Sequence, residues 1–193
     1  MLQELNTDLL RSLHWLLEYP MIEKIIYIFA DAPIFLIPVF LITAWIVYKR
    51  QESKKIDLLH IFYGCMWAIM ISVFIQQFVD LARPESALTG SAKLILNHIP
   101  DASFPSDHAT VSFSFLAGLF LAGYKKLWYM FLVLAVLMNI SRVIAWVHWP
   151  LDILAGAMVW VIASLLSFKC VMKIGFVNKV NLFIIKLSSY LKL

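Results

Sequence analysis

Five apolar stretches, each on the order of twenty residues long, constrain this chain more than any other feature of its sequence. A helix of that length crosses a hydrocarbon core about 30 Å thick, and a helix that is apolar on all sides has to face lipid or protein. The sequence therefore predicts an all-α integral membrane protein, a bundle of about five transmembrane helices. The expected spans are residues 32–48, 57–79, 106–123, 127–146 and 150–170.

The two ends of the chain differ from these spans. Residues 3–30 carry leucines at helical spacing with charged residues between them, and they predict interfacial helices that lie on the membrane surface. The C-terminal stretch 174–193 is apolar with spaced lysines and predicts another interfacial helix. Neither an internal repeat nor a low-complexity linker interrupts the sequence, so we expect one domain, residues 1–193.

The charged residues support a membrane protein and exclude a nucleic-acid-binding one. Hydrophobic residues make up 62% of the chain and charged residues 15%, with a net charge of +4. A soluble domain usually has close to half of its residues apolar. The basic residues flank the apolar stretches and do not alternate with aromatic residues on a polar face, so no nucleic acid partner is expected.

The basic residues also predict an orientation. With five spans, segments 49–56, 124–126 and 169–193 share one side of the membrane, and they hold eleven of the sixteen Lys and Arg residues. The positive-inside rule makes that side cytoplasmic. The segment 80–105 then faces the periplasm or the cell exterior.

Chemically active residues gather at the outer ends of these spans. Arg83 follows the second span, Ser106 and His108 open the third, and Arg142 closes the fourth. His148 and Asp152 flank the start of the fifth span. These groups are far apart in the sequence but share one depth in the membrane, as the residues of a single site between helix ends would.

Each residue type suits the chemistry of a phosphate. Guanidinium groups bind phosphate oxygens with two parallel hydrogen bonds. The start of a helix, here at Ser106, favours an anion through its free N–H groups and its dipole. Imidazole acts as a nucleophile or a general acid near neutral pH. Asp152 lies within one turn of His148 and is expected to hold one ring nitrogen, as in a catalytic triad.

Taken singly, these residues have ordinary explanations. A lone Arg83 would be an interfacial cation, a lone Ser106 a helix cap, and a lone Asp152 a helix N-terminal charge. We read Asp31 as a surface acid. The coincidence of two arginines, two histidines and one aspartate at one face favours a site over the ordinary explanations.

The same segments resemble a known three-part signature. Arg83-Pro84, Pro105-Ser106-Asp107-His108, and Ser141-Arg142 followed by His148 and Asp152 are similar to the motifs of the type 2 phosphatidic acid phosphatase superfamily, which also includes vanadium haloperoxidases. The short chain and the Pro-Ser-Asp-His sequence most resemble bacterial undecaprenyl-diphosphate phosphatases of the bacitracin-resistance type.

The resemblance implies a role for each matching residue. His148 would attack phosphorus and form a phosphohistidine, with Asp152 orienting its ring. His108 would protonate the leaving oxygen and then help to activate water. Arg83, Ser106, Arg142 and the backbone N–H of Asp107 would hold the phosphoryl oxygens. Neither a metal nor a cofactor is expected.

Two positions depart from the family's usual pattern. Gln76 stands where the family often has Lys, and it is a further candidate for phosphate binding. Lys93 is a candidate to replace the missing cation. Asp107 stands where the family usually has Gly, and we expect its carboxylate to bind Arg142 or His108.

The expected activity is dephosphorylation of a lipid-linked phosphate or diphosphate, in particular undecaprenyl diphosphate to undecaprenyl phosphate. The expected location is the bacterial cytoplasmic (inner) membrane, with the site facing the periplasm or exterior. Phosphatidylglycerol phosphate, phosphatidic acid and lipid A are alternative substrates, and a lipid phosphotransferase is an alternative activity. A non-catalytic lipid-binding membrane protein is the alternative of another class. The sequence does not predict an oligomeric state.

Overall fold

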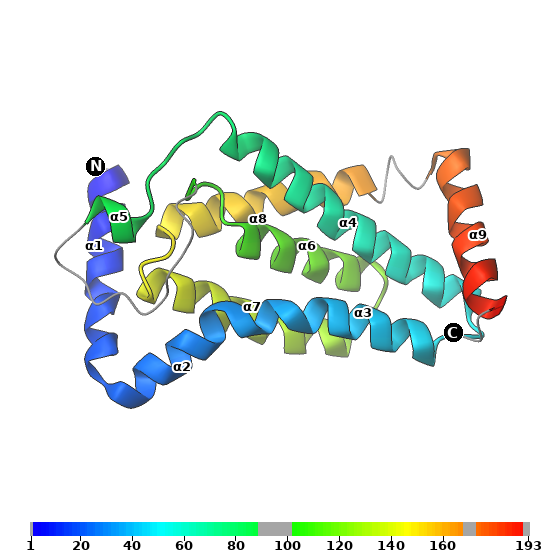
Figure 1. Ribbon diagram of the computed structural model, residues 1–193, viewed down its shortest axis with the longest axis horizontal. Helices are drawn as coiled ribbons and strands as arrows, with labels where there is room; N and C mark the ends of the chain where they lie inside the picture. Colours follow the sequence, from blue (N-terminus) through cyan, green and yellow to red (C-terminus); the bar gives the residue numbers. More distant parts are fainter. Residues whose placement is uncertain (1, 89–101, 168–172, 191–193) are drawn as a thin grey trace.

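The computed structural model describes residues 2–88, 102–167 and 173–190, and all regular structure in these ranges is helical. Long helices lie side by side along the longest axis of the molecule, while α1 (Leu2–His14) and α9 (Gly175–Tyr190) lie across its two ends (Figure 1). This arrangement confirms an all-α bundle with a helix across each end, as the apolar stretches and the amphipathic ends predict.

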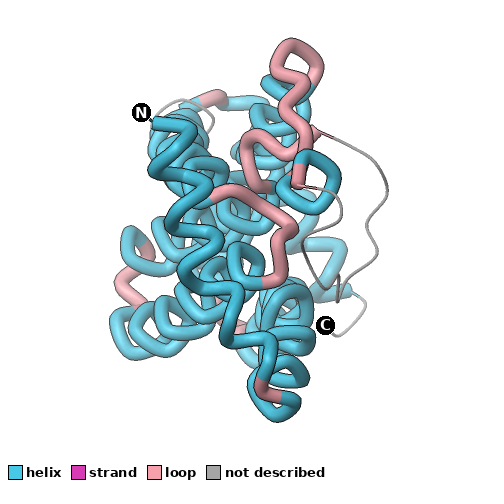
Figure 2. Tube along the Cα trace, turned by 90° about the vertical axis from the view of Figure 1, so that its left-hand side faces the viewer, coloured by secondary structure: helices cyan, strands magenta, loops and turns pink. Residues whose placement is uncertain are grey.

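Helix α1 closes one end of the bundle. It crosses in front of the long helices when the molecule is viewed from that end (Figure 2). Leu10 is fully buried there against Trp146 and Trp149. The side chain of Asn6 accepts a hydrogen bond of 3.1 Å from the backbone N–H of Leu151, so α1 satisfies one of the N–H groups that the start of a helix leaves unpaired.

The first long helical segment is broken near its middle. Helix α2 (Pro20–Asp31), a 3₁₀ turn η2 (Ala32–Phe35) and helix α3 (Leu36–Val47) follow one another without a loop, and together they are long and apolar enough to cross a membrane. The sequence predicts the break but assigns α2 to the surface. Helical structure continues because Pro33 occupies the first turn of η2, where its missing N–H costs no hydrogen bond.

The remaining long helices match the predicted spans closely. They are α4 (Glu52–Gln76), α6 (Asp107–Leu121), α7 (Lys125–Ile144) and α8 (Pro150–Leu165). Helices α4 and α7 have the length and apolar composition of a membrane span, whereas α6 and α8 are shorter apolar helices. The chain leaves α4 at Gln76, before the predicted end at residue 79, and reaches the short helix α5 (Pro84–Ala87) through an extended segment.

Helix α6 is the centre of the bundle. It packs mainly against α8 and α4, and also against α7. Phe115 and Leu119 are buried in an apolar core that includes Ile61 of α4 and Phe131 of α7. Helix α6 has 15 residues, which span about 22 Å. Its first turn lies further from the α1 end than the last turn of α7 and the first turn of α8 (Figure 1), so its N-terminus is recessed inside the bundle.

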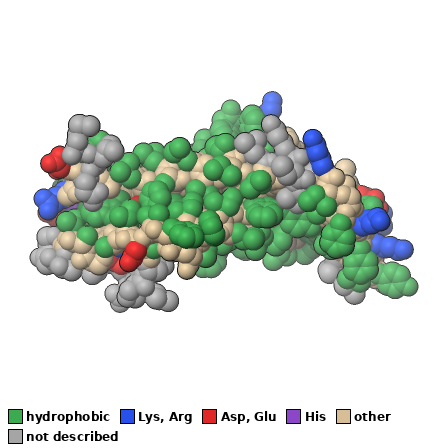
Figure 3. Space-filling view, turned by 90° about the horizontal axis from the view of Figure 1, so that it is seen from above, with side chains coloured by type: hydrophobic (Ala, Val, Ile, Leu, Met, Phe, Trp, Pro, Cys, Tyr) green, Lys and Arg blue, Asp and Glu red, His purple; other side chains and the backbone are tan. Residues whose placement is uncertain are grey.

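The outer surface is apolar around the middle of the bundle and charged at its ends. Large apolar side chains such as Ile42, Phe74, Val133 and Met158 are exposed, as lipid-facing residues are. Lys and Arg side chains gather at the α9 end (Figure 3). There the ammonium of the buried Lys55 donates a hydrogen bond of 2.8 Å to the hydroxyl of Ser188 and so ties α9 to α4.

Candidate active site

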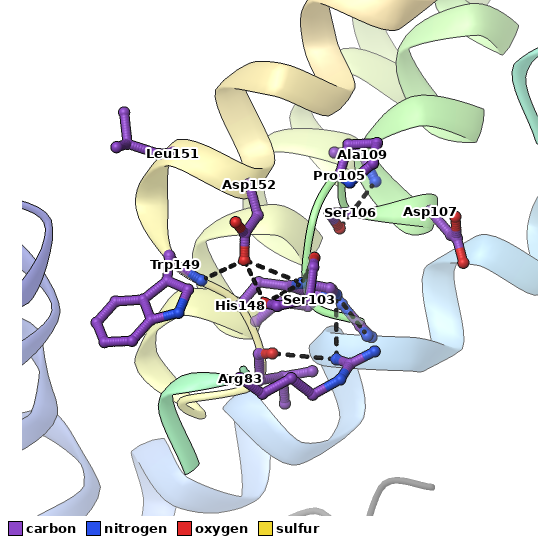
Figure 4. A network of polar contacts seen from close by, with 12 residues as sticks. Arg83, Ser103, Pro105, Ser106, Asp107, Ala109, His148, Trp149, Leu151 and Asp152 are labelled. Carbon is purple, nitrogen blue, oxygen red and sulfur yellow. Dashed lines mark hydrogen bonds and ion pairs between the residues drawn. The ribbon is translucent and has the colours of Figure 1, made fainter. Parts of the chain in front are cut away.

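The residues of the three motifs meet at the α1 end of the bundle, around the recessed start of α6 (Figure 4). Five of them are buried side chains, although four of these five are charged or titratable: Arg83, Ser106, Arg142, His148 and Asp152. Buried charges are retained in proteins where they are paired or serve a ligand. The structure therefore brings together the residues that the sequence predicts for one site.

The two nitrogens of His148 have different surroundings. Nδ1 lies 3.0 Å from the carbonyl oxygen of Ser103. A carbonyl oxygen only accepts hydrogen bonds, so Nδ1 carries the proton and Nε2 keeps its electron pair. Nε2 lies 3.3 Å from Nη1 of Arg83 and 3.3 Å from Nη2 of Arg142. Nε2 of His148 is thus held between two guanidinium groups.

Hydrogen bonds to backbone carbonyls fix the loop that carries His148. Trp146 adopts a left-handed backbone conformation with φ 61°, and its buried ring lies 4.4 Å from the ring of His14, centroid to centroid. Arg83 donates a hydrogen bond of 3.0 Å to the carbonyl of Val147, and the backbone N–H of Glu85 donates one of 3.2 Å to the carbonyl of Trp146. The first and third motifs are therefore joined directly.

Asp152 contacts His148 as predicted, and a residue that the sequence did not reveal lies beside both. Oδ2 of Asp152 lies 3.5 Å from Nδ1 of His148 and accepts a hydrogen bond of 2.9 Å from the N–H of Trp149. The hydroxyl of Ser103 donates to the same oxygen. Ser103 thus orients the imidazole through its carbonyl and the carboxylate through its hydroxyl. It belongs to no motif, and no sequence signal marks it.

Ser106 caps α6 and joins it to α8. Its hydroxyl accepts a hydrogen bond of 3.5 Å from the N–H of Ala109, and its own N–H donates one of 3.2 Å to the carbonyl of Asp152. Gly156 of α8 makes this approach feasible, because a Cβ atom there would lie only 2.8 Å from the carbonyl oxygen of Ser106. The positive end of the α6 dipole therefore points into the site.

Asp107 and Gln76 contact each other. The carboxylate of Asp107 accepts hydrogen bonds of 2.6 Å from Ser72 and 3.0 Å from the side-chain amide of Gln76. That amide also donates a hydrogen bond of 3.3 Å to the carbonyl of Pro105. Asp107 was expected to bind Arg142 or His108, and its charge does act on Arg142. Its hydrogen bonds come from Ser72 and Gln76 of α4, so Gln76 and Asp107, the two residues that depart from the family pattern, contact each other.

Arg142 and His108 share a different carboxylate, that of Asp31. Nη1 of Arg142 forms an ion pair with Oδ1 of Asp31, and Nε2 of His108 lies 3.4 Å from the same oxygen. The interpretation of Asp31 as a surface acid is therefore wrong, although its side chain is partly exposed. The sequence signal was the break at the end of α2, which leaves Asp31 at the depth of the other motifs.

Lys93 lies outside the described residues, as does most of the segment that follows Arg83. Within the described ranges, no group of three or more His, Cys, Asp or Glu residues is placed to hold a metal ion. Metal independence stays a prediction.

Comparisons with known proteins agree with this geometry. Residues 57–176 match the family described as the PAP2 superfamily. The chain is 31% identical over 179 residues to the "Bacitracin transport permease protein BcrC" of Bacillus licheniformis, a match that covers 91% of this chain and 85% of the relative. It is 41% identical over 123 residues to an "Undecaprenyl-diphosphatase" of Sulfolobus acidocaldarius, covering 64% of this chain and 56% of that one.

A solved structure shares the fold. The crystal structure of LpxE from Aquifex aeolicus superposes with a TM-score of 0.66 at 21% sequence identity, covering 86% of this chain and 95% of that one.

Proposed function

Because the chain belongs to the PAP2 superfamily, we propose that it is a membrane phosphatase that removes phosphate from a lipid phosphate or diphosphate. The observation that carries this proposal is the position of His148, whose Nε2 lies 3.3 Å from a guanidinium nitrogen of Arg83 and of Arg142. A phosphoryl group bound by both arginines would place its phosphorus in front of that electron pair.

The reaction has two balanced steps. In the first step, Nε2 of His148 forms a bond to phosphorus while the bond from phosphorus to the leaving oxygen breaks, and His108 gives that oxygen a proton. In the second step, a water oxygen forms a bond to phosphorus while His108 takes a proton from that water, the bond from phosphorus to Nε2 breaks with its electron pair returning to His148, and inorganic phosphate leaves. Asp152 and Ser103 stabilise the positive charge that develops on the His148 ring.

Arg83 and Arg142 bind the phosphoryl oxygens, with Ser106 and the backbone N–H of Asp107 at the start of α6. Gln76 acts on this group indirectly, because its amide binds the Asp107 carboxylate and the carbonyl of Pro105. Neither a metal nor a cofactor takes part.

We propose undecaprenyl diphosphate as the substrate. The name of the Sulfolobus relative supports this choice. An apolar groove between α7 and α8 supports a lipid tail: Leu9 and Leu13 of α1 border it, and it reaches Val143 and Pro150, neighbours of the site. The tail would stay in hydrocarbon while the diphosphate reaches His148.

The proposed location is the bacterial cytoplasmic membrane, with the site at its outer face and residues 1–193 acting as one domain. The basic side chains at the α9 end support this orientation, since they would lie in the cytoplasm (Figure 3).

The test is phosphate release by the purified protein in detergent. Undecaprenyl diphosphate should be turned over faster than phosphatidylglycerol phosphate, phosphatidic acid or lipid A, and a chelator should not change the rate. Release without an added acceptor lipid separates a hydrolase from a phosphotransferase.

The variant His148→Ala should abolish release, a loss of about 10⁴-fold or more. His60→Ala, which removes an imidazole near the α9 end, should stay active. Undiminished release by His148→Ala would overturn the proposal.

A further inference from the structure

Asp31 is a carboxylate of the site that the three motifs do not include. It ends α2, and its Oδ1 atom contacts both Arg142 and Nε2 of His108, at 3.4 Å from the latter. The backbone carbonyl of its neighbour Ala30 accepts a further hydrogen bond of 3.0 Å from Arg142. The negative end of the α2 dipole and the Asp31 carboxylate thus meet the buried guanidinium together.

The carboxylates of Asp107 and Asp152 accept hydrogen bonds from other groups, and the charge of Asp107 also acts on Arg142. Asp107, on the same helix as His108, accepts from Ser72 and Gln76. Asp152 accepts from Trp149 and contacts Ser103 and His148. Among the described residues of the site, Arg83 and Arg142 are cations, and they disfavour a further positive charge nearby. The carboxylate of Asp31, in contact with His108, can offset the effect of these two cations on that histidine.

We propose that Asp31 is a positioning residue: it holds His108 in its protonated form, ready to give a proton to the leaving oxygen, and it releases Arg142 to the incoming phosphoryl group. The proposal rests on the phosphatase function proposed above. A carboxylate beside an imidazole stabilises the imidazolium. The same carboxylate competes with an anionic substrate for Arg142, since both bind the guanidinium through oxygen.

The nature of the leaving group decides how much Asp31 matters. When a lipid monophosphate is cleaved, the leaving oxygen becomes an alcohol, and an alkoxide is too basic to leave without a proton. When a lipid diphosphate is cleaved, a lipid phosphate leaves, which is stable as an anion. A proton from His108 therefore accelerates the monophosphate reaction strongly and the diphosphate reaction little.

The test compares farnesyl monophosphate with farnesyl diphosphate, which share a tail and differ in the leaving group. With the monophosphate, Asp31→Asn should lower kcat by about 10- to 100-fold, a part of the roughly 10²- to 10⁴-fold that general acid catalysis contributes. With the diphosphate, kcat should fall less than about 3-fold, because protonation of the leaving group by His108 contributes little to that reaction. KM should fall for both substrates because the competitor of the phosphoryl group at Arg142 is neutral.

Three further measurements distinguish a role of Asp31 in positioning His108 from a role in folding alone. The high-pH limb of the monophosphate kcat profile should move to lower pH in Asp31→Asn, because an imidazolium without its carboxylate loses its proton more readily. Asp31→Glu should restore most of the activity. The double variant Asp31→Asn/His108→Ala should be no slower than His108→Ala, since Asp31 acts through His108. Glu23→Gln, at the opposite end of α2, is the matched control.

The outcomes are distinguishable. If the wild-type protein releases phosphate from neither substrate, the phosphatase function itself fails. If the wild type is active and Asp31→Asn loses the same factor on both substrates, or if its effect adds to that of His108→Ala, the role of Asp31 is overturned.

Discussion

At the scale of single residues, Gln76 and Asp107 show how two unusual residues offset each other. A carboxylate in the first turn of α6 adds negative charge beside a phosphate site, but it accepts hydrogen bonds of 2.6 Å from Ser72 and 3.0 Å from Gln76. Gln76, which stands in place of the family's usual lysine, thus donates to Asp107, which stands in place of its usual glycine. From the sequence alone, Gln76 and Asp107 look like two unrelated departures from the family pattern.

This contact predicts that the two residues are energetically coupled. Asp107→Ala and Gln76→Ala should each lower the thermal unfolding temperature, because each breaks the same charge-assisted hydrogen bond, worth about 1.5–3 kcal/mol. The double variant should lose less than the sum of the two, and unfolding temperatures measured in detergent check this. Strict additivity would show that the contact contributes nothing.

The motif residues could be predicted from the sequence, and their partners could not. Arg83, His148 and Asp152 stand at helix ends with distinctive spacing, so their types and their shared depth identify them. Ser103 and Asp31 lack such a pattern. Asp31 meets Arg142 across 111 residues of sequence, and only the packing of α2 on α7 brings the two together.

At the scale of elements, the close approach of α6 and α8 positions the site. A Cβ atom on Gly156 would lie 2.8 Å from both the Cβ of Ala109 and the carbonyl oxygen of Ser106. Glycine allows two helix backbones to approach in this way. The contact places the start of α6 beside Asp152, whose carbonyl accepts from Ser106.

Gly156→Ala should therefore push the two helices apart. Overpacking of this kind costs about 1–3 kcal/mol, which lowers the unfolding temperature by several degrees for a chain of this size. The rate of phosphate release should fall at least tenfold, because small displacements of catalytic groups lower the rate strongly. Gly175→Ala is the control, since a Cβ atom there would meet no heavy atom within 4 Å. Equal unfolding temperatures and equal rates of phosphate release for the two variants would contradict this interpretation of the contact between α6 and α8.

The helices themselves were largely predictable. Hydropathy locates α4, α6, α7 and α8 because lipid-facing and core-facing residues are both apolar. The sequence predicts a surface helix at α2 because Glu23, Lys24 and Asp31 give it an amphipathic pattern, whereas in the structure α2 continues through η2 into α3, and the three together have the length and composition of a span. The structure packs α2 against α7, which the sequence pattern of α2 does not reveal.

At the scale of the whole molecule, the two ends differ in charge and in function. Basic side chains gather at the α9 end (Figure 3), and the site lies around the starts of α6 and α8, near α1 (Figure 1). The positive-inside rule then predicts that the α1 end faces outward. A substrate released outside the cytoplasm would reach the site without crossing the membrane.

Cysteine labelling tests this orientation. In a chain with Cys65 and Cys170 replaced by Ala, an Asp8→Cys variant on α1 should react with a membrane-impermeant maleimide in intact cells. A Ser189→Cys variant on α9 should react only after the cells are opened, because the exposed Ser189 lies at the basic end. The reverse labelling pattern would place the site in the cytoplasm.

The most direct measurement of the central claim is the phosphorylated intermediate on His148. The protein is incubated briefly with a diphosphate substrate labelled with ³²P in its terminal phosphate, quenched in alkali, in which phosphohistidine survives, and digested into peptides. We expect the label on the peptide that contains His148, more of it in His108→Ala, where hydrolysis of the intermediate is slowed, and none in His148→Ala. Label on another residue, or continued turnover by His148→Ala, would contradict the account.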